Sequence, residues 1–552
     1  MSDDAGAVSA LTALQDRLDD EMCTWPAEPT LYTRANAVDQ WPSPMTPLTQ
    51  DLIAFPQERG LGRAFGRELE TAAEGDAWTW NGVFYGWYTY CVGPAAEMAD
   101  NLPGYSRAAV YSDYFGVTED PDAPPVHAKG ASPAALAKIG WNFLRVIRTY
   151  PKHATRMMDK ARARLRTDLT LDWSAVSDEA LAARLSGHVE EATEFRVPHA
   201  EASVLSASLF QNASKLVRKL DPEHGDTLLT EALSGLGGIH LREATRAMGE
   251  VAAGRMSRED FLDQYGFRGA NEFELAALPW RDDPATVDRL IAAAATERPD
   301  TAAESRERAR ARLRELAGPR WPMVRWLLGF LETHLRWREN GKVPMALATH
   351  SMRLLTREAG RRLVERGRIG EPDDVFYLRL DELIGELSGH ETPELDKAIK
   401  RRQQTIELSA TLPLPEMLDV RPGLLEQIGP ARWASMGVLP PKPPSSDGSQ
   451  LVGVGGAPGT ATGRARIVFD PNEVELEEGD VIVARGTDSA WTPLFFQAAA
   501  VVIDVGGVMS HPAIAAREVG IPCVVNVKTG TTQVTEGQSI TVDGNAGRVE
   551  LH

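Results

Sequence analysis

The pattern of apolar residues changes abruptly near residue 440. Up to Leu439, apolar residues recur mainly at three- and four-residue spacing, which is typical of helices. After Leu451 they fall into short β-branched runs separated by glycine, which is typical of strands. A helix and a strand need different periods, so a chain of 552 residues with both patterns is expected to fold as at least two regions of different class.

A proline- and serine-rich stretch separates the two patterns. Prolines stiffen its first half and small polar residues loosen its second half, as in linkers. We therefore expect a multidomain protein: a large, mostly α-helical domain over 1–438, a hinge over 439–450 and a small β/α domain over 451–552. The alternative is a surface loop within one domain.

The periodicity also predicts individual elements. We expect the region from about 25 to 435 to be all-helical. Its clearest helical stretches are 134–169, 177–220, 228–253, 301–338 and 345–366. The strands expected near the C-terminus are 465–469, 481–484, 500–505, 523–527 and 539–542, with a single helix over 512–519.

Charge and cysteine content exclude several classes of function. Lys plus Arg is 59 and Asp plus Glu is 78, so the net charge of −19 disfavours binding to nucleic acid and to anionic membranes. The three cysteines are too scattered for a disulfide framework or a CxxC metal site, and no apolar run reaches the ~18 residues of a membrane span. The start of the chain lacks the pattern of a secretory signal. We expect a cytoplasmic protein without a metal site.

One segment after residue 500 places a histidine at the start of a helix. An apolar run predicts a buried strand that ends at Val505, and Gly506 and Gly507 allow a tight turn after it. Pro512 favours the first position of a helix, with His511 at the helix mouth. Free N–H groups there stabilise phosphate oxygens, and neutral imidazole can carry a phosphoryl group. A lone histidine at such a place is equally compatible with a helix cap.

The segment 504–525, DVGGVMSHPAIAAREVGIPCVV, resembles the signature of the phosphohistidine swivelling domain. Pyruvate phosphate dikinase, phosphoenolpyruvate synthase and rifampicin phosphotransferase share this domain. Residues 488–495 and 455–468 also look like it, so the resemblance covers 451–552. It implies that His511 carries a phosphoryl group between separate sites.

We expect four residues around His511 to hold the phosphate: Gly506, Gly507, Ser510 and Arg517. Two of them have alternatives. Ser510 could bond the start of the helix, and Arg517 could form an ion pair with Glu518 or Glu550.

Three segments of the helical region are similar to the acceptor-binding domain of rifampicin phosphotransferase-like proteins: 31–49, 265–275 and 371–378. In the second segment, Arg268 and Glu272 follow the predicted helix stop at Gly266. Arg268 could hold the transferred phosphate and Glu272 could take the proton of the acceptor hydroxyl. An Arg–Glu pair that only fixes the loop is an equal alternative.

The acceptor site is expected among aromatic residues. Tryptophan and tyrosine gather between Trp78 and Tyr90, and on a helix they would cover more than one face. Some rings could then line a cavity for an aromatic or apolar acceptor, although plain core packing explains the cluster as well. The candidate substrate-binding residues are Arg34, Asn36, Trp80, Tyr85 and Trp87.

The sequence contains no GxxxxGK[ST] loop, and no stretch of it looks like the nucleotide-binding domain that precedes the helical domain in rifampicin phosphotransferase. We therefore expect no cofactor on this chain alone, with ATP and Mg²⁺ bound by a separate ATP-grasp subunit that charges His511 in trans. Two alternatives stay open. Another donor could charge His511, or the histidine could serve as an acid–base group. The chain could also be a noncatalytic partner of a full-length enzyme.

Overall fold

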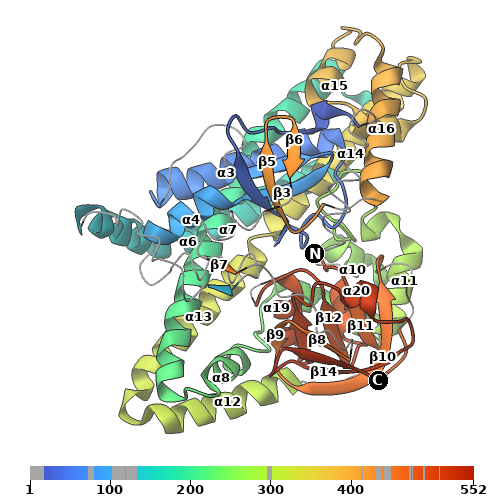
Figure 1. The fold of residues 1–552 in the computed structure, drawn as a ribbon. Coiled ribbons are helices and arrows are strands. Elements are labelled where there is room, and N and C mark those ends of the chain that lie inside the picture. Colours follow the sequence, from blue (N-terminus) through green and yellow to red (C-terminus); the bar gives the residue numbers. More distant parts are fainter. Residues whose placement is uncertain are drawn as a thin grey trace.

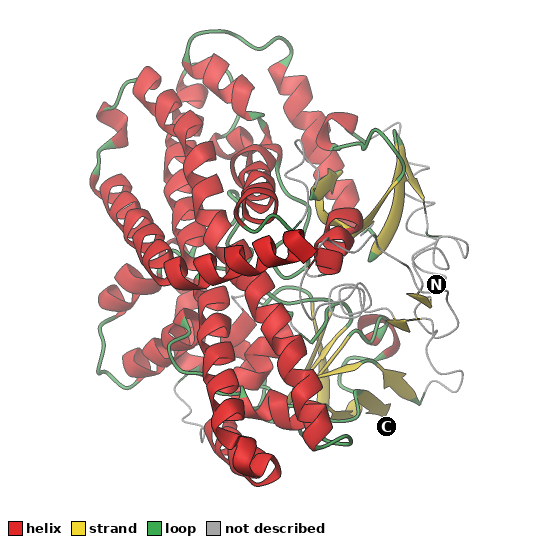
Figure 2. Ribbon diagram, turned by 90° about the vertical axis from the view of Figure 1, so that its left-hand side faces the viewer, coloured by secondary structure: helices red, strands yellow, loops and turns green. Residues whose placement is uncertain are grey.

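The computed structural model describes residues 18–35, 37–71, 80–101, 118–119, 133–294, 301–411, 414–426, 428, 438–439, 449–471, 474, 476–488, 491–508 and 510–552. They form a large, mostly helical region and a smaller C-terminal region built on a sheet (Figures 1 and 2). Residues 440–448 of the expected hinge lie outside the described residues. Its two ends belong to the short strands β7 (Val438–Leu439) and β8 (Gln450–Val452).

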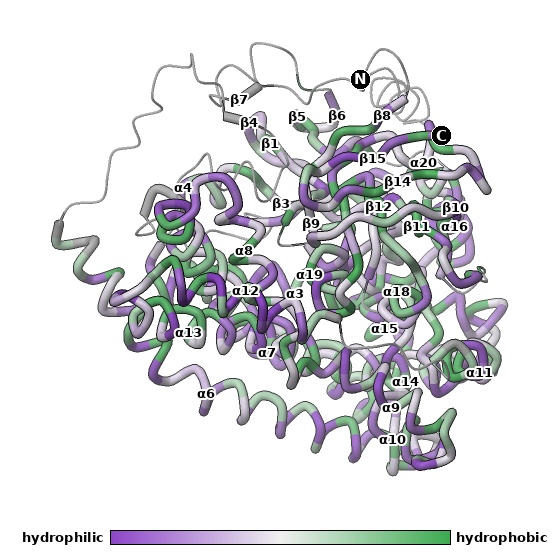
Figure 3. The backbone as a smooth tube through the Cα atoms, turned by 90° about the horizontal axis from the view of Figure 1, so that it is seen from below, coloured by the Kyte–Doolittle hydropathy of each residue, from purple (hydrophilic) through white to green (hydrophobic). Residues whose placement is uncertain are grey.

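Two long helices run through the helical region, and the sequence predicted both. They are α6 (Pro133–Thr170) and α7 (Asp178–Leu220), and α6 alternates hydrophilic and hydrophobic positions along the edge of the molecule (Figure 3). Ser177 begins α7, because its side chain accepts a hydrogen bond from the Ala180 N–H. Helix α7 packs against α3 (Phe55–Gly62), α13 (Trp321–Asn340) and α14 (Val343–Glu365).

Shorter helices complete this region. They are α2 (Pro47–Thr49), α4 (Val92–Asn101), α8 (Gly225–Ala232), α9 (His240–Ala252), α10 (Arg258–Tyr265), α11 (Pro284–Ala293), α12 (Thr301–Ala317), α15 (Leu380–Leu387) and α16 (Leu395–Thr411). Within the described ranges, no helix is both long enough and apolar enough to cross a membrane.

The helical region also contains a five-stranded antiparallel sheet in the order β2-β3-β1-β5-β6. Its strands are β1 (Thr30–Thr33), β2 (Asn81–Phe84), β3 (Trp87–Cys91), β5 (Met417–Arg421) and β6 (Leu424–Glu426). The expectation of an all-helical region is therefore wrong. Strand β1 pairs with β5, so Leu31 lies opposite Asp419, and the sheet joins two distant parts of the chain.

The helix expected for the aromatic cluster is wrong as well, because its described part forms the β2–β3 hairpin. Tyr85 and Gly86 have φ angles of 50° and 87° and make a two-residue turn between the paired residues Phe84 and Trp87. Two successive positive φ angles suit the twist of a hairpin and end any helix. Almost every residue of both strands is buried, which hides the alternation expected of a half-exposed strand. Trp78 lies outside the described residues.

The C-terminal sheet has eight strands in the order β8-β15-β14-β10-β11-β12-β13-β9. The predicted strands are present as β10 (Thr460–Val468), β11 (Val481–Ala484), β12 (Ala500–Ile503), β13 (Cys523–Val525) and β14 (Ser539–Asp543). Strands β9 (Val454–Ala457) and β15 (Arg548–Leu551) complete it with β8. The neighbours β10, β11, β12 and β13 are parallel.

Helix α19 (His511–Val519) connects the parallel strands β12 and β13 and covers one face of the sheet. Ala513 and Ala516 pack there against Ile482 and Val501. Gly520 ends the helix in a left-handed conformation, with φ 83°. The start of α19 therefore lies at the carboxyl ends of the parallel strands, where open α/β sheets bind their ligands.

Candidate active site

His511 is the first residue of α19, and the preceding loop fixes its position. Gly506 has a φ of 150°, and a side chain there would lie 2.9 Å from the Ser510 Oγ. Ser510 adopts the extended conformation of an N-cap, but its hydroxyl donates to the Gly507 carbonyl at 2.7 Å and does not cap the helix. The structure does not show the alternative bond from Ser510 to the start of the helix, because the hydroxyl holds the loop.

The helical region caps the start of α19. The His511 backbone N–H donates to Oδ2 of Asp39 at 2.6 Å, and Asp39 follows strand β1. A carboxylate is favourable at the positive end of a helix dipole. His511 thus faces the helical region, held there by a hydrogen bond between the two regions.

The imidazole of His511 is buried, with only 3% of the residue exposed. Burial lowers its pKa to about 3, and the positive charge of Lys342 acts in the same direction. Glu339 and a hydrogen bond to the backbone of Asp488 act in the opposite direction. Within the described part of the chain, Nε2 has no hydrogen-bond partner. At neutral pH the ring is uncharged, and an uncharged imidazole nitrogen is a nucleophile.

Charged residues gather beside His511 where α13 ends and α14 begins. Oε1 of Glu339 lies 3.8 Å from Arg338 Nε, and Oε2 lies 3.5 Å from Lys342 Nζ. Burial alone would raise the pKa of Glu339, but Lys342 and Arg338 hold it below its ordinary value. The same two cations also act on the carboxylate of Asp39. Arg338 and Lys342 can contribute charge-assisted hydrogen bonds to a phosphate at this place.

Asp39, Arg338 and Lys342 also line a cavity of about 130 Å³, called the central cavity below. Its charged end adjoins the start of α19, because Asp39 holds the His511 N–H. The walls away from these charges are mostly apolar and aromatic. The other lining residues are Ala35, Gln40, Leu61, Phe65, Trp80, Tyr90, Cys91, Ala95, Met98, Arg196, His199, Ala200, Ser203 and Val204.

Asp39 is the carboxylate shared by the cavity and the histidine. Burial raises its pKa to about 6, although the hydrogen bond from the His511 N–H lowers it. Its second oxygen, Oδ1, is buried and finds no hydrogen-bond partner among the described residues. Asp39 can therefore accept a proton near neutral pH without giving up its bond to His511.

The structure places Arg268 and Glu272 in a buried loop after α10. Nη1 of Arg268 donates to both oxygens of Glu272 at 2.9 Å, and Nη2 lies 3.3 Å from Nδ1 of His240. The charge of Arg268 lowers the pKa of His511, so the pair is near the histidine, but neither residue lines the central cavity. The same loop contacts the C-terminal region, because the Asn271 N–H donates to Oδ2 of Asp488 at 2.6 Å.

Arg517 is buried and has backbone partners. Its Nε donates to the Gly456 carbonyl at 2.6 Å and its Nη2 to the Val508 carbonyl at 2.5 Å. These bonds tie α19 to β9 and to the glycine loop. Neither Glu518 nor Glu550 forms the ion pair that was the alternative for Arg517 among the described contacts.

Of the expected substrate-binding residues that the structure describes, only Trp80 lines the central cavity. Arg34 stacks on the Trp87 ring, with its Cζ 3.9 Å from the ring centroid, and its Nη1 donates to the Leu414 carbonyl. The Trp87 indole donates to the Ser409 carbonyl, and the Tyr85 hydroxyl to Asp20. Asn36 lies outside the described residues.

Sequence reasoning missed four charged residues of the cavity: Asp39, Arg196, Arg338 and Lys342. A weak signal exists for the last two, because their spacing of four residues places them on one side of a helical turn. Asp39 and Arg196 carry no local pattern, and only the fold brings them together.

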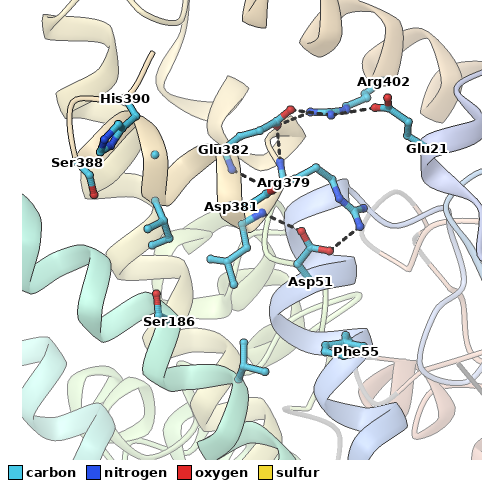
Figure 4. A pocket seen from close by; sticks show the side chains of 14 residues that line it. Glu21, Asp51, Phe55, Ser186, Arg379, Asp381, Glu382, Ser388, His390 and Arg402 are labelled. Atoms are coloured by element: carbon cyan, nitrogen blue, oxygen red, sulfur yellow. Dashed lines mark hydrogen bonds and ion pairs between the residues drawn. The ribbon is translucent and has the colours of Figure 1, made fainter. Parts of the chain in front are cut away.

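A wider groove of about 970 Å³ lies elsewhere, among α3, α7, α15 and α16 (Figure 4). Its charged residues pair with one another. Arg379 bonds Asp51 at 2.8 Å, and Arg402 bonds Glu382 at 2.7 Å. None of the charged residues beside His511 lines this groove. The central cavity is therefore the candidate active site.

Two family models match the chain. The model described as PEP-utilising enzyme, mobile domain, matches residues 476–547, which include His511. The model described as rifampicin phosphotransferase fourth domain matches residues 211–339, which include Arg268, Glu272 and Arg338. The two matched ranges are close in space at the start of α19, because Arg268 and Glu339 of the second range act on the pKa of His511.

Named enzymes are among the relatives. Rifampicin phosphotransferase of Streptomyces sviceus is 28% identical over 359 residues, which cover 62% of this chain and 38% of that protein. The protein of the same name from Bacillus cereus is 26% identical, with the same coverage. Prodigiosin synthesizing transferase of Serratia marcescens is 29% identical over 52% of this chain and 32% of its own length.

The match spans only 32% to 38% of these three relatives. Over the matched residues, the chain is therefore similar to rifampicin phosphotransferases and to the mobile domain of PEP-utilising enzymes.

Proposed function

We propose that this protein is a phosphohistidine phosphotransferase, in which His511 passes a phosphoryl group to a hydroxyl of a small aromatic or apolar acceptor in the central cavity. The observation that carries the proposal is the state of His511. Its imidazole is neutral and buried, its Nε2 has no partner among the described residues, and its backbone is bonded to Asp39 of the cavity wall.

The transfer step breaks one bond and forms another. The acceptor oxygen attacks the phosphorus, the P–N bond to His511 breaks, and its electron pair returns to the imidazole. Lys342 and Arg338 stabilise the negative charge of the phosphoryl oxygens during this step. The hydroxyl proton goes to a base, and the neutral imidazole is ready for the next phosphoryl group.

Two carboxylates compete for the role of the base. The sequence points to Glu272, with Arg268 as a phosphate clamp, but both oxygens of Glu272 accept from Arg268. Asp39 has a buried oxygen without a partner among the described residues and lines the cavity. We assign the base to Asp39, and Arg268 then acts through its charge on His511.

A donor must charge His511 before transfer. We infer that an ATP-grasp subunit with bound ATP and Mg²⁺ does so in trans. The C-terminal region would leave the cavity to reach that subunit, with the stretch around 439–450 as its hinge. Gly506, Gly507 and Ser510 would then lie beside the phosphoryl group.

The test separates charging from transfer. Phosphoramidate, a small phosphoryl donor that charges histidines, would be used to label the wild-type chain and His511→Ala, and mass spectrometry would locate the label. We expect an acid-labile, alkali-stable phosphate on His511 that a phenolic acceptor removes as a phosphate ester. The same label should arise from the β-phosphate of ATP when a purified ATP-grasp partner is added.

Three results would contradict this proposal. Equal labelling of His511→Ala would exclude His511 as the carrier. A charged His511 that no hydroxyl compound discharges would favour an acid–base or noncatalytic role. Tight ATP binding by the chain alone would remove the need for a separate subunit.

A further inference from the structure

Arg196 of α7 lines the central cavity but has no part in the transfer step proposed above. It is 4% exposed, and its side chain bonds Tyr90. Its Nε and Nη1 are buried and have no hydrogen-bond partner among the described residues. No carboxylate of the described part of the chain forms an ion pair with it. Two N–H donor groups of this buried guanidinium therefore have no acceptor among the described residues.

Buried arginines of this region differ in their partners. Arg34 also has two donors without a partner among the described residues, but it stacks on Trp87, whereas two others are paired with carboxylates. Arg268 bonds both oxygens of Glu272, and Arg402 bonds Glu382 at 2.7 Å. A buried charge without a partner is costly, so proteins pair buried charges or use them to bind ligands. Arg196 is also held tightly against α3, because a side chain on Gly60 would lie 2.5 Å from its Cβ. This arginine is therefore fixed in place and ready for an anion.

The apolar wall indicates the size of the ligand. Phe65 and Trp80 pack with ring centroids 4.8 Å apart, and Leu61, Met98 and Val204 lie beside them on the cavity wall. A cavity of about 130 Å³ is close to the ~150 Å³ that holds one benzene ring in an engineered protein core. A single ring with its substituents therefore fits.

We propose that the central cavity selects a one-ring acceptor that carries a carboxylate, and that Arg196 binds this carboxylate while the hydroxyl points toward Asp39. Nε and Nη1 of this guanidinium are each available to donate a charge-assisted hydrogen bond to a carboxylate oxygen. The place of the hydroxyl rests on the proposed function, whereas the carboxylate site does not.

Binding to His511→Ala tests the site without any transfer. Isothermal titration calorimetry would compare 4-hydroxybenzoate with 4-hydroxybenzamide, which has the same shape without the charge. Hydrogen bonds to a charged group predict about 10- to 100-fold tighter binding of the benzoate. A second substitution, Arg196→Met, should reduce benzoate affinity to that of the amide. Arg218→Met, at an exposed site of the same helix, is the control and should leave both affinities unchanged.

Equal affinity for the two compounds, or no binding of either, would overturn the proposal even if Arg196→Met does not fold. Equal weakening of both compounds by Arg196→Met would do the same, because it would indicate a packing role. Selective benzoate binding without discharge of a charged wild-type His511 onto it would support the carboxylate site and contradict the proposed transfer.

Discussion

Burial gives His511 a different charge from that of an exposed histidine. An exposed imidazole titrates near pH 6.5, whereas burial lowers the pKa of His511 to about 3. The ring is therefore neutral throughout the pH range in which most proteins are stable. Any pH dependence of transfer between pH 5 and 8 has to come from another group, and Asp39 is the nearest one.

The first prediction concerns Asp39. Its pKa is raised to about 6, so it is protonated below that pH and cannot act as a base. Discharge of phosphorylated His511 onto an acceptor should therefore rise between pH 5 and 7 with a midpoint of about 6. Asp39→Asn keeps an oxygen for the His511 N–H but should slow discharge about 10²- to 10⁴-fold and flatten the pH profile. Rapid-quench kinetics would measure both.

Glu272→Gln is the matched comparison, because it removes the other candidate carboxylate. We expect this variant to keep the midpoint of about 6 and to lose some stability from the broken Arg268 pair. Slow discharge in Glu272→Gln together with a normal rate in Asp39→Asn would return the role of base to Glu272.

Single elements differ in how much of them the sequence reveals. Strands β10 to β14 of the C-terminal sheet were predictable because each is a short β-branched run, whereas β8, β9 and β15 were not predicted. The N-terminal sheet was not, since it takes β1, the β2–β3 hairpin and β5–β6 from three distant parts of the chain. Its hairpin is buried on both faces, so no alternation marks it, and the aromatic residues were interpreted as a helix.

The residues of the site also differ in whether the sequence reveals them. His511 was predictable because a local motif, a strand, glycines and a helix start, encodes its position. Asp39 follows β1, Arg196 lies within α7, and Lys342 precedes α14, so only tertiary packing brings them together. The sequence analysis therefore found His511 but not the charged end of the cavity.

The second prediction tests the hairpin turn. Gly86 has a φ of 87°, and a Cβ there would lie 2.9 Å from the Pro44 Cβ and 3.0 Å from the Met45 carbonyl oxygen. Gly86→Ala should lower the free energy of unfolding by about 1–3 kcal/mol through backbone strain and overlap. Gly140→Ala is the control. Gly140 lies within α6 with nothing within 4 Å of an added Cβ, so this change should raise stability by about 0.5–1 kcal/mol. Chemical denaturation would measure both.

Several polar contacts and close approaches join the two regions among the described residues. Asn271 bonds Asp488, Lys528 pairs with Glu416, and a side chain on Gly486 would lie 2.7 Å from Val38. Transient interfaces within a chain are typically polar in this way. Such an interface can open without exposing a large apolar core, as a mobile carrier requires.

The third prediction concerns Glu518, which lies in this interface 3.5 Å from Arg242. Burial raises its pKa to about 8, while Arg242 and Arg306 lower it and Glu339 raises it. Because the pKa is raised in the closed form, protonation favours closure. This contribution is complete below the ordinary pKa of Glu518 and is lost as pH rises through about 8. Small-angle scattering should show the wild-type chain expand between pH 7 and 9.

Glu518→Gln should stay closed over the same pH range, because the side chain no longer gains a charge. Glu550→Gln, at an exposed site on β15, is the control and should expand like the wild type. Expansion of Glu518→Gln at the wild-type midpoint would show that another group controls the opening.

The bond from the His511 N–H to Asp39 means that the first turn of α19 is capped by a residue of the other region. If the C-terminal region departs as the proposed function requires, the helix would lose this cap and its first amide would face water. A phosphoryl group on the same residue is then the nearest anion that can satisfy that amide. In the open form the phosphoryl group of His511 would accept the hydrogen bond from the His511 N–H. On return to the cavity, Asp39 would accept that bond again. The phosphoryl group and Asp39 would compete for the same N–H group. Binding of the C-terminal region to the cavity would therefore weaken the hold of His511 on its phosphoryl group and favour transfer.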